Sequence, residues 1–175
     1  MLKDRILAGT IAGMIAALAK DVPNLILWKL GIVKYSYFTI AASSLLRPQD
    51  TTSILGWVLG IIVDIITGGT LGIVIIFLFK LTGRDYWWYK GLIAGNLIWL
   101  LGLGILINIG FARIIPIDPI FRITSLFEHQ VFGLTAAYLI FTWYPTGDRT
   151  KLYSSRRFGE GNRLVPSPAR KKRLK

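Results

Sequence analysis

The sequence predicts an all-α, polytopic membrane protein with four transmembrane helices and a short interfacial or re-entrant helix between the first two. Hydrophobic residues make up 53% of the 175 residues and charged residues only 17%, more apolar surface than a soluble domain of this size can bury. Long stretches with at most one charge can each cross the ~30 Å hydrocarbon core with about 20 residues. Most charges lie at the chain ends and in short connecting segments, so the bilayer is the expected solvent.

The first span is predicted at residues 5–33, although Lys20, Asp21 and Pro23 interrupt its apolar run. One interpretation is a signal peptide, with a short charged start, an apolar region at 6–15 and the cleavage-like "ALA" at 17–19. The other is one membrane helix that carries the ion pair inside it and kinks at Pro23.

Small residues favour the uncleaved helix. Gly9, Gly13 and Ala17 recur every four residues and form a face that allows a second membrane helix to approach closely. A cleaved signal peptide needs no such face.

The later spans follow from their hydropathy. Residues 54–79 contain one charge and residues 91–111 contain none, so they predict the second and third crossings. Residues 123–144, polar only near their start, predict the fourth. The apolar segment 35–46 is too short to cross, so it suits an interfacial or re-entrant helix. The stretch 114–122 holds two prolines and predicts a rigid non-helical turn.

Four crossings place both termini on one side, and the basic tail selects that side. Ten of the 21 Lys and Arg residues follow Pro145. Without them the count near the helix ends is five against five: Lys3, Arg5, Lys80, Arg84 and Lys90 against Lys29, Lys34, Arg47, Arg113 and Arg122. Because Lys and Arg are enriched in cytoplasmic segments, both termini are expected in the cytoplasm.

The chain divides into a transmembrane domain, 1–145, and a basic tail, 146–175, which has few apolar residues and predicts disorder. The net charge of +12 would point a soluble protein toward nucleic acid. Next to a membrane, each tail Lys or Arg gains about 1 kcal/mol from anionic headgroups. The tail is therefore expected to contact anionic lipid rather than nucleic acid, chiefly through Arg170, Lys171, Lys172 and Arg173.

A glycine stripe in the second span contains its only charge. The stripe repeats every four residues without a break, as Gly56, Gly60, Asp64, Gly68 and Gly72. Residues four apart share one side of a helix, so Asp64 is expected to face another helix and not lipid. The small face of the first span is the matching surface. The first two spans are therefore predicted to be in contact.

The same reasoning predicts a buried polar cluster of Lys20, Asp64 and His129, with Asp21 and Asn24 near it. His129 shares a four-residue repeat with Gly133, whereas Glu128 is turned about 100° away and need not join. Whether Lys20 pairs with Asp21 or with Asp64 stays open at this stage. A charged side chain inside a membrane costs about 2.5–3.5 kcal/mol on insertion scales, so it marks a candidate functional site.

The function expected first is a non-enzymatic structural or accessory membrane component, alone or with a homo-oligomeric or membrane-protein partner. A small proton-coupled transporter or ion pathway through the polar cluster is the alternative. No hydrolase, zinc-protease or nucleotide-binding motif is present. With one His and no Cys, no metal or cofactor site is expected. A third interpretation, an enzyme acting on lipid or isoprenoid, lacks a motif.

Three segments carry a family resemblance: "RILAGTIAGMIAALAKDVPN" at 5–24, "TGGTLGIVIIFLF" at 67–79 and "HQVFGL" at 129–134. With them the chain resembles the YqhR-like and YagU-like families of small four-helix bacterial inner-membrane proteins. The resemblance covers about the first 145 residues and implies a fold and a membrane location. It implies no particular molecular activity.

Overall fold

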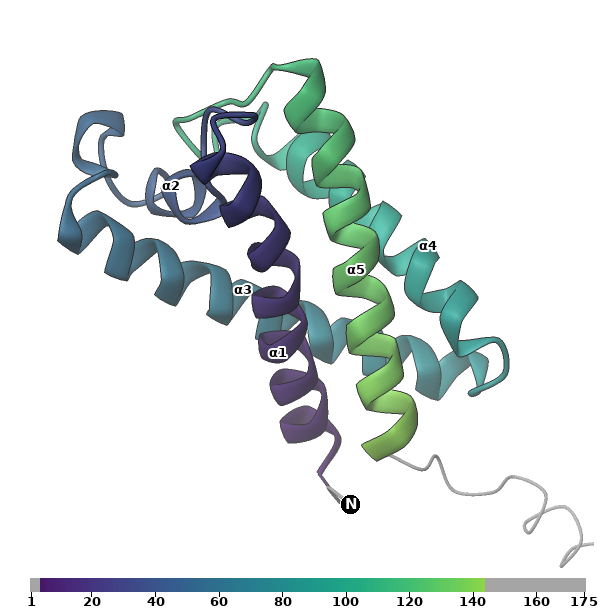
Figure 1. Ribbon diagram of the computed structural model, residues 1–175. Coiled ribbons are helices and arrows are strands. Elements are labelled where there is room, and N and C mark those ends of the chain that lie inside the picture. The colour runs from purple at the N-terminus through teal and green to yellow at the C-terminus, as the bar shows by residue number, and fades with distance from the viewer. Residues whose placement is uncertain (1–3, 144–175) are drawn as a thin grey trace, which may run out of the picture. The chain divides into compact units, whose positions relative to one another are not determined.

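The computed structural model describes residues 4–143, in which every regular element is a helix and no strand occurs (Figure 1). The elements, in chain order, are α1 (Arg5–Lys29), α2 (Tyr37–Ala42), the 3₁₀ turn η1 (Pro48–Asp50), α3 (Ile54–Thr82), α4 (Trp87–Trp99), the π-helix η2 (Leu100–Leu106) and α5 (Pro119–Trp143).

Three of these stretches are long and apolar enough to cross a membrane: Arg5–Lys29, Ile54–Thr82 and Trp87–Leu106. Large apolar side chains cover their outer surfaces, and Ile66 and Val74 on α3 are 58% and 60% exposed. Water is a poor solvent for so apolar an exterior, whereas lipid chains suit it. The structure is therefore that of an all-helical protein compatible with a membrane.

Local capping sets the helix ends. The Asp4 side chain accepts a hydrogen bond of 2.8 Å from the backbone N–H of Leu7 at the start of α1, and Ser53 caps α3 in the same way through Gly56. Gly83, with φ of 81°, ends α3 in a backbone conformation that other residues rarely adopt. α1 continues through Pro23 as one helix.

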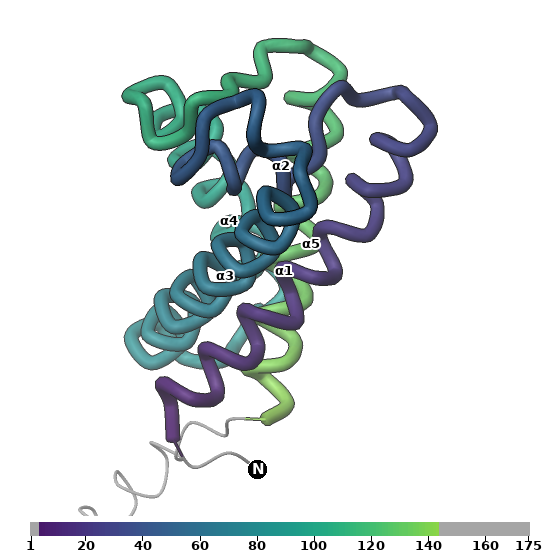
Figure 2. The backbone as a smooth tube through the Cα atoms, turned by 90° about the vertical axis from the view of Figure 1, so that its left-hand side faces the viewer, coloured from purple at the N-terminus to yellow at the C-terminus, as the bar shows by residue number. Residues whose placement is uncertain are grey.

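The helices pack as an antiparallel group (Figures 1 and 2). α1 lies against α3 and α5, and α4 lies against α5, while α3 crosses obliquely. The start of α1, the end of α5 and the α3–α4 connection share one end of the group. α2 and the segment between η2 and α5 share the other end.

Glycines bring the α1 and α3 backbones into contact. A Cβ on Gly9 would lie 2.9 Å from the carbonyl oxygen of Gly72, and one on Gly68 would lie 2.6 Å from the Ala17 Cβ. A Cβ on Gly13 would overlap the Gly68 carbonyl oxygen. No side chain larger than hydrogen fits at these positions, so the two helices meet nearly backbone to backbone.

The remaining glycines of the predicted helix-packing set also face backbone. Gly56 faces the η1 turn, and Gly60 faces Phe38 of α2. On α5, Gly133 faces Gly91 and Gly95 of α4. The small-residue faces therefore serve two helix pairs, α1 with α3 and α4 with α5, and also seat α2 on α3.

Several helix boundaries differ from those expected. The predicted turn at 114–122 is wrong in its last part, because α5 begins at Pro119, which occupies a first-turn position where its missing N–H costs nothing. The first span ends at Lys29, and the third begins at Trp87 and ends in η2. Segment 35–46 contains one short helix, α2, most of which is buried by protein.

Candidate functional site

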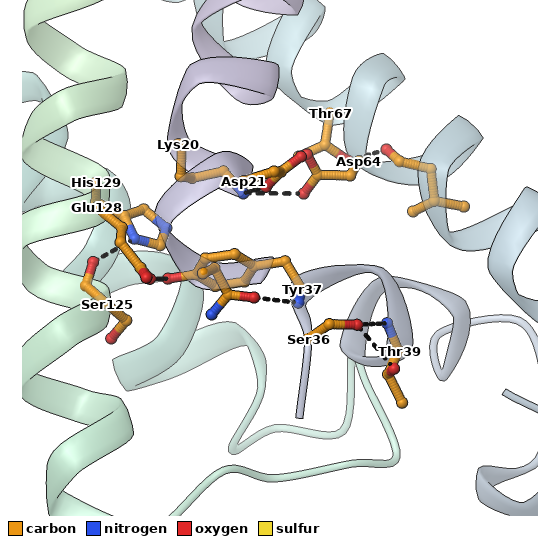
Figure 3. Close-up of polar contacts among 12 residues, drawn as sticks. Lys20, Asp21, Ser36, Tyr37, Thr39, Asp64, Thr67, Ser125, Glu128 and His129 are labelled. Atoms are coloured by element: carbon orange, nitrogen blue, oxygen red, sulfur yellow. Dashed lines mark hydrogen bonds and ion pairs between the residues drawn. The ribbon is translucent and has the colours of Figure 1, made fainter. Parts of the chain in front are cut away.

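Lys20 lies at the centre of a buried polar cluster between α1, α2, α3 and α5 (Figure 3). Its ammonium nitrogen is 2.5 Å from Asp21 Oδ1 and 3.3 Å from Asp64 Oδ1. The same nitrogen lies 3.8 Å from the centre of the Tyr37 ring, within cation–π distance. Lys20 therefore pairs with both acids at once, and the Tyr37 ring takes its third side.

Tyr37 joins the two ion pairs of Lys20 to a third acid, Glu128. Its hydroxyl donates a 2.7 Å hydrogen bond to Glu128 Oε2, and its backbone N–H donates a 2.9 Å bond to Asn24 Oδ1. Burial and the nearby Glu128 charge raise the pKa of the Tyr37 hydroxyl well above its ordinary value. The hydroxyl therefore stays protonated and remains a donor.

His129 lies on the other side of the Tyr37 ring. The two rings meet edge to face with their centres 5.7 Å apart. His129 Nδ1 is 2.7 Å from the backbone carbonyl oxygen of Ser125. A carbonyl only accepts, so Nδ1 carries a hydrogen and donates it to Ser125, and Nε2 is the ring nitrogen left for another partner.

The acids outnumber the bases in this cluster. Asp21 and Glu128 are buried and Asp64 is partly buried, with its side chain 15% exposed, beside Lys20, the single cation of the cluster. Within residues 4–143, one oxygen of each carboxyl group is buried without a hydrogen-bond partner, as is the Asn24 amide nitrogen. Buried polar groups in native proteins are seldom unpaired, because each such group costs about 1–3 kcal/mol. The cluster therefore has unused capacity to accept hydrogen bonds at its carboxyl groups and to donate them from the Asn24 amide.

A cavity of about 290 Å³ adjoins the cluster between α3 and the α4–η2 stretch. Lys20, Tyr37, Asp64 and His129 contribute polar atoms to its wall. The rest of the wall is mostly hydrocarbon, including Val63, Leu71, Ile98, Leu103, Leu106 and Phe132. The cavity has the composition of a small-ligand site, an apolar chamber with a few converging polar groups.

The structure places all five residues of the predicted polar cluster in one region. Lys20, Asp21 and Asp64 form the ion pairs, Asn24 anchors Tyr37, and His129 lines the cavity. His129 makes no hydrogen bond to Lys20 or Asp64, so its contact with the ion pairs is less direct than the sequence predicted. The predicted lipid-contacting residues of the tail lie outside the described residues.

Sequence reasoning missed Tyr37 and Glu128. Glu128 was visible as part of a stripe in which spacings of three and four alternate, through Phe121, Ser125, Glu128 and Phe132, all buried on α5. This stripe is missed when only the four-residue repeat that contains His129 is considered. Tyr37 had no such signal, because its position depends on how the chain turns back after α1.

No group of three metal-binding side chains occurs among residues 4–143. Comparison with known proteins finds no matching family, no similar curated protein and no similar solved structure.

Proposed function

We propose that the protein is a small, non-enzymatic, proton-coupled transporter or ion pathway built on the cluster of Lys20, Asp21, Asp64 and Glu128. Its charge imbalance is the observation that carries the proposal. With every group ionised, three carboxylates would face one ammonium in a region of low dielectric constant, which is unfavourable. The cluster therefore holds protons or an outside cation, and releasing and rebinding either is what a coupled pathway requires.

The proposed membrane arrangement has four spans: α1, α3, α4 continued by η2, and α5. α5 has 25 residues, about 37 Å of helix, and runs the length of α1 and α4. Glu128, His129 and Gln130 lower its hydropathy, yet Glu128 is buried and the lipid does not have to solvate it. α2 does not cross. Both termini are proposed to lie in the cytoplasm of a bacterial cell.

The absence of cysteine from the chain makes this arrangement easy to test. Single cysteines replace Thr52 and Ile117 at one end, and Asp85 and Thr142 at the other, all exposed positions. In intact cells, a membrane-impermeant maleimide is expected to label the first two and to spare the second two until the membrane is opened. Labelling of both Ile117→Cys and Thr142→Cys in intact cells would show that α5 does not cross.

Proton movement tests the function itself. Purified protein in liposomes carrying an internal pH dye receives a pH gradient with a potassium–valinomycin clamp. Wild type is expected to carry protons above the protein-free rate, and Asp64→Asn to fall to that rate. Asp50→Asn is the matched control, because Asp50 forms an exposed ion pair with Arg47 on η1, away from the cluster. Wild-type flux equal to that of empty liposomes would exclude the pathway.

The close contact of α1 with α3 supports a second candidate, a structural or accessory membrane component. Gly13 and Gly68 meet at backbone distance, and the Lys20–Asp64 ion pair lies on the same interface. Such a pair fixes which turns of two helices face each other. This role predicts no flux, a loss of stability in Lys20→Met, and a second copy or another membrane protein recovered with the tagged chain.

Two further expectations remain proposals. Membership of the YqhR-like and YagU-like families would fit a four-span arrangement. Contact of the tail with anionic lipid is tested by comparing vesicle binding of the tail peptide 146–175 with and without anionic lipid. Equal binding to both vesicles would contradict the lipid role.

A further inference from the structure

The cavity beside the cluster accepts hydrogen bonds but has no free donor to offer. Lys20 directs its ammonium group to Asp21, to Asp64 and to the Tyr37 ring. The Tyr37 hydroxyl donates to Glu128. His129 uses its Nδ1 hydrogen on the Ser125 carbonyl. The polar hydrogens of these lining residues are thus already committed within the protein.

The aliphatic hydroxyl groups of Ser44 and Thr67 in the cavity wall follow the same pattern. Thr67 donates to the Val63 carbonyl oxygen at 2.7 Å, and Ser44 donates to the Ala41 carbonyl oxygen at 2.7 Å. What remains is acceptor capacity on the Asp64 carboxylate, which lines the cavity with its side chain 15% exposed and gives only Oδ1 to Lys20. In the neutral ring form, His129 Nε2 accepts as well. A ligand that fits this wall has to supply hydrogen atoms.

The charge of the polar cluster restricts the chemical class of the ligand further. The excess of carboxyl groups over Lys20 favours a cation and disfavours an anion such as a phosphate headgroup. A metal ion is a poor match, because its oxygen ligands would have to come from a mainly hydrocarbon wall, and residues 4–143 contain no cluster of metal-binding side chains. The cation is therefore organic.

The volume of the cavity and its apolar wall restrict the non-polar part of the ligand. The volume of about 290 Å³ is at the lower end of the range of small-molecule pockets. Leu71 on α3, Ile98 on α4 and Leu106 on η2 offer an apolar surface for a short hydrocarbon chain. The cavity thus combines a polar end suited to an ammonium group with a chamber suited to its alkyl part.

We infer that the cavity binds a small alkylammonium cation, with its N–H groups on Asp64 and His129 and its hydrocarbon part between α3 and η2. This inference deepens the proposed function, since such a cation is a substrate that could exchange with protons on the cluster. Binding is nevertheless measurable without transport, so the two ideas fail separately.

Three probes of one chain length test the inference by calorimetry, on protein in nanodiscs of zwitterionic lipid with empty nanodiscs as the blank. Hexylammonium has both charge and N–H groups, hexyltrimethylammonium has the charge alone, and hexanoate has the opposite charge. Hexylammonium is expected to bind saturably and at least about tenfold more tightly than the trimethyl compound, the worth of a charge-assisted hydrogen bond. Hexanoate is not expected to bind.

Two variants test separately the contribution of the Asp64 charge and that of the space in the cavity. Asp64→Asn is expected to weaken hexylammonium binding by about tenfold or more, and Asp50→Asn to leave it unchanged. Gly102→Leu fills the chamber instead: Gly102 lines the cavity and a Cβ there would meet no atom within 4 Å, so the fold has room for the substitution. This variant keeps every charge, and it remains informative if Asp64→Asn does not fold.

Specific outcomes would overturn the site. Hexanoate binding as tight as that of hexylammonium would contradict the acceptor argument. Binding that survives Gly102→Leu unchanged, or that equals the signal of empty nanodiscs, would place the ligand elsewhere. Hexylammonium binding without proton flux, even with hexylammonium present in the flux assay, would keep the binding site and exclude the transporter. Proton flux without hexylammonium binding would keep the transporter and exclude the binding site.

Discussion

The two sides of α3 differ in how closely they meet their neighbours. Toward α1, its glycines let two backbones touch and leave no space between Gly13 and Gly68. Toward η2, larger side chains such as Val63 and Leu71 line a cavity of about 290 Å³. Small residues on both partners thus close an interface, while branched side chains opposite a π-helix leave an open chamber.

The π-helix itself contributes to that opening. η2 contains Gly102 and Gly104, and its wider turn leaves carbonyl oxygens available to other groups. Asn108 donates to the Gly104 carbonyl oxygen at 2.7 Å, and Arg122 donates to that of Leu103 at 2.8 Å. Side chains from outside η2 therefore hold the irregular wall in place. Pi-helical turns often occur at functional sites.

The largest effect on stability is expected at Lys20, which contacts Asp64 of α3 and also lines the cavity. Lys20→Met leaves Asp21 and Asp64 without their shared cation and should lower the free energy of unfolding by about 3–5 kcal/mol. Unfolding in mixed micelles of increasing denaturing detergent measures this loss. A double-mutant cycle with Asp64→Asn should give a coupling energy of about 0.5–3 kcal/mol. A value of zero would show that the 3.3 Å contact contributes nothing.

Alanine in place of glycine tests the contrast between the two sides directly. Gly13→Ala forces a Cβ onto the Gly68 carbonyl oxygen and should cost about 1–3 kcal/mol or more. Gly102→Ala meets open space and should be neutral or slightly stabilising, because alanine is a better helix former than glycine. The same detergent titration measures both. Equal losses of stability in both variants would contradict the difference between the tightly packed α1 side of α3 and the side that lines the cavity.

A smaller effect is expected from the Tyr37 hydroxyl. Tyr37→Phe keeps the ring beside Lys20 and His129 but leaves Glu128 Oε2 without its donor, at a cost of about 1–3 kcal/mol. Tyr35→Phe, outside the cluster, is the matched control and should change little. Comparable losses in both variants would indicate that the hydroxyl bond to Glu128 has no special weight.

The smallest effect is expected at the exposed ion pair of Arg47 with Asp50. Their side chains are 73% and 42% exposed, so water and salt screen them. Asp50→Asn should change stability by less than about 1 kcal/mol, and less still at high salt. A loss as large as that of Lys20→Met would contradict the view that burial gives the cluster its importance.

Much of the helical plan followed from local pattern. The four-residue repeats of glycine and alanine on the first two spans predicted their contact, and the structure has α1 on α3 through those residues. Such repeats are informative because residues four apart share a face of the same helix. The wrong boundary at Pro119 came from treating proline only as a helix breaker, although it is well placed in a first turn.

The sequence by itself determined the all-helical class, the apolar stretches and the small-residue faces, because each of these depends on neighbours within one or two turns. Only the tertiary structure decided which acids surround Lys20, that Tyr37 lies between Lys20 and His129, and that a cavity adjoins them. The physical reason is distance along the chain. Glu128 and Tyr37 are 91 residues apart, and no local preference specifies a hydrogen bond that forms only when α2 and α5 pack together.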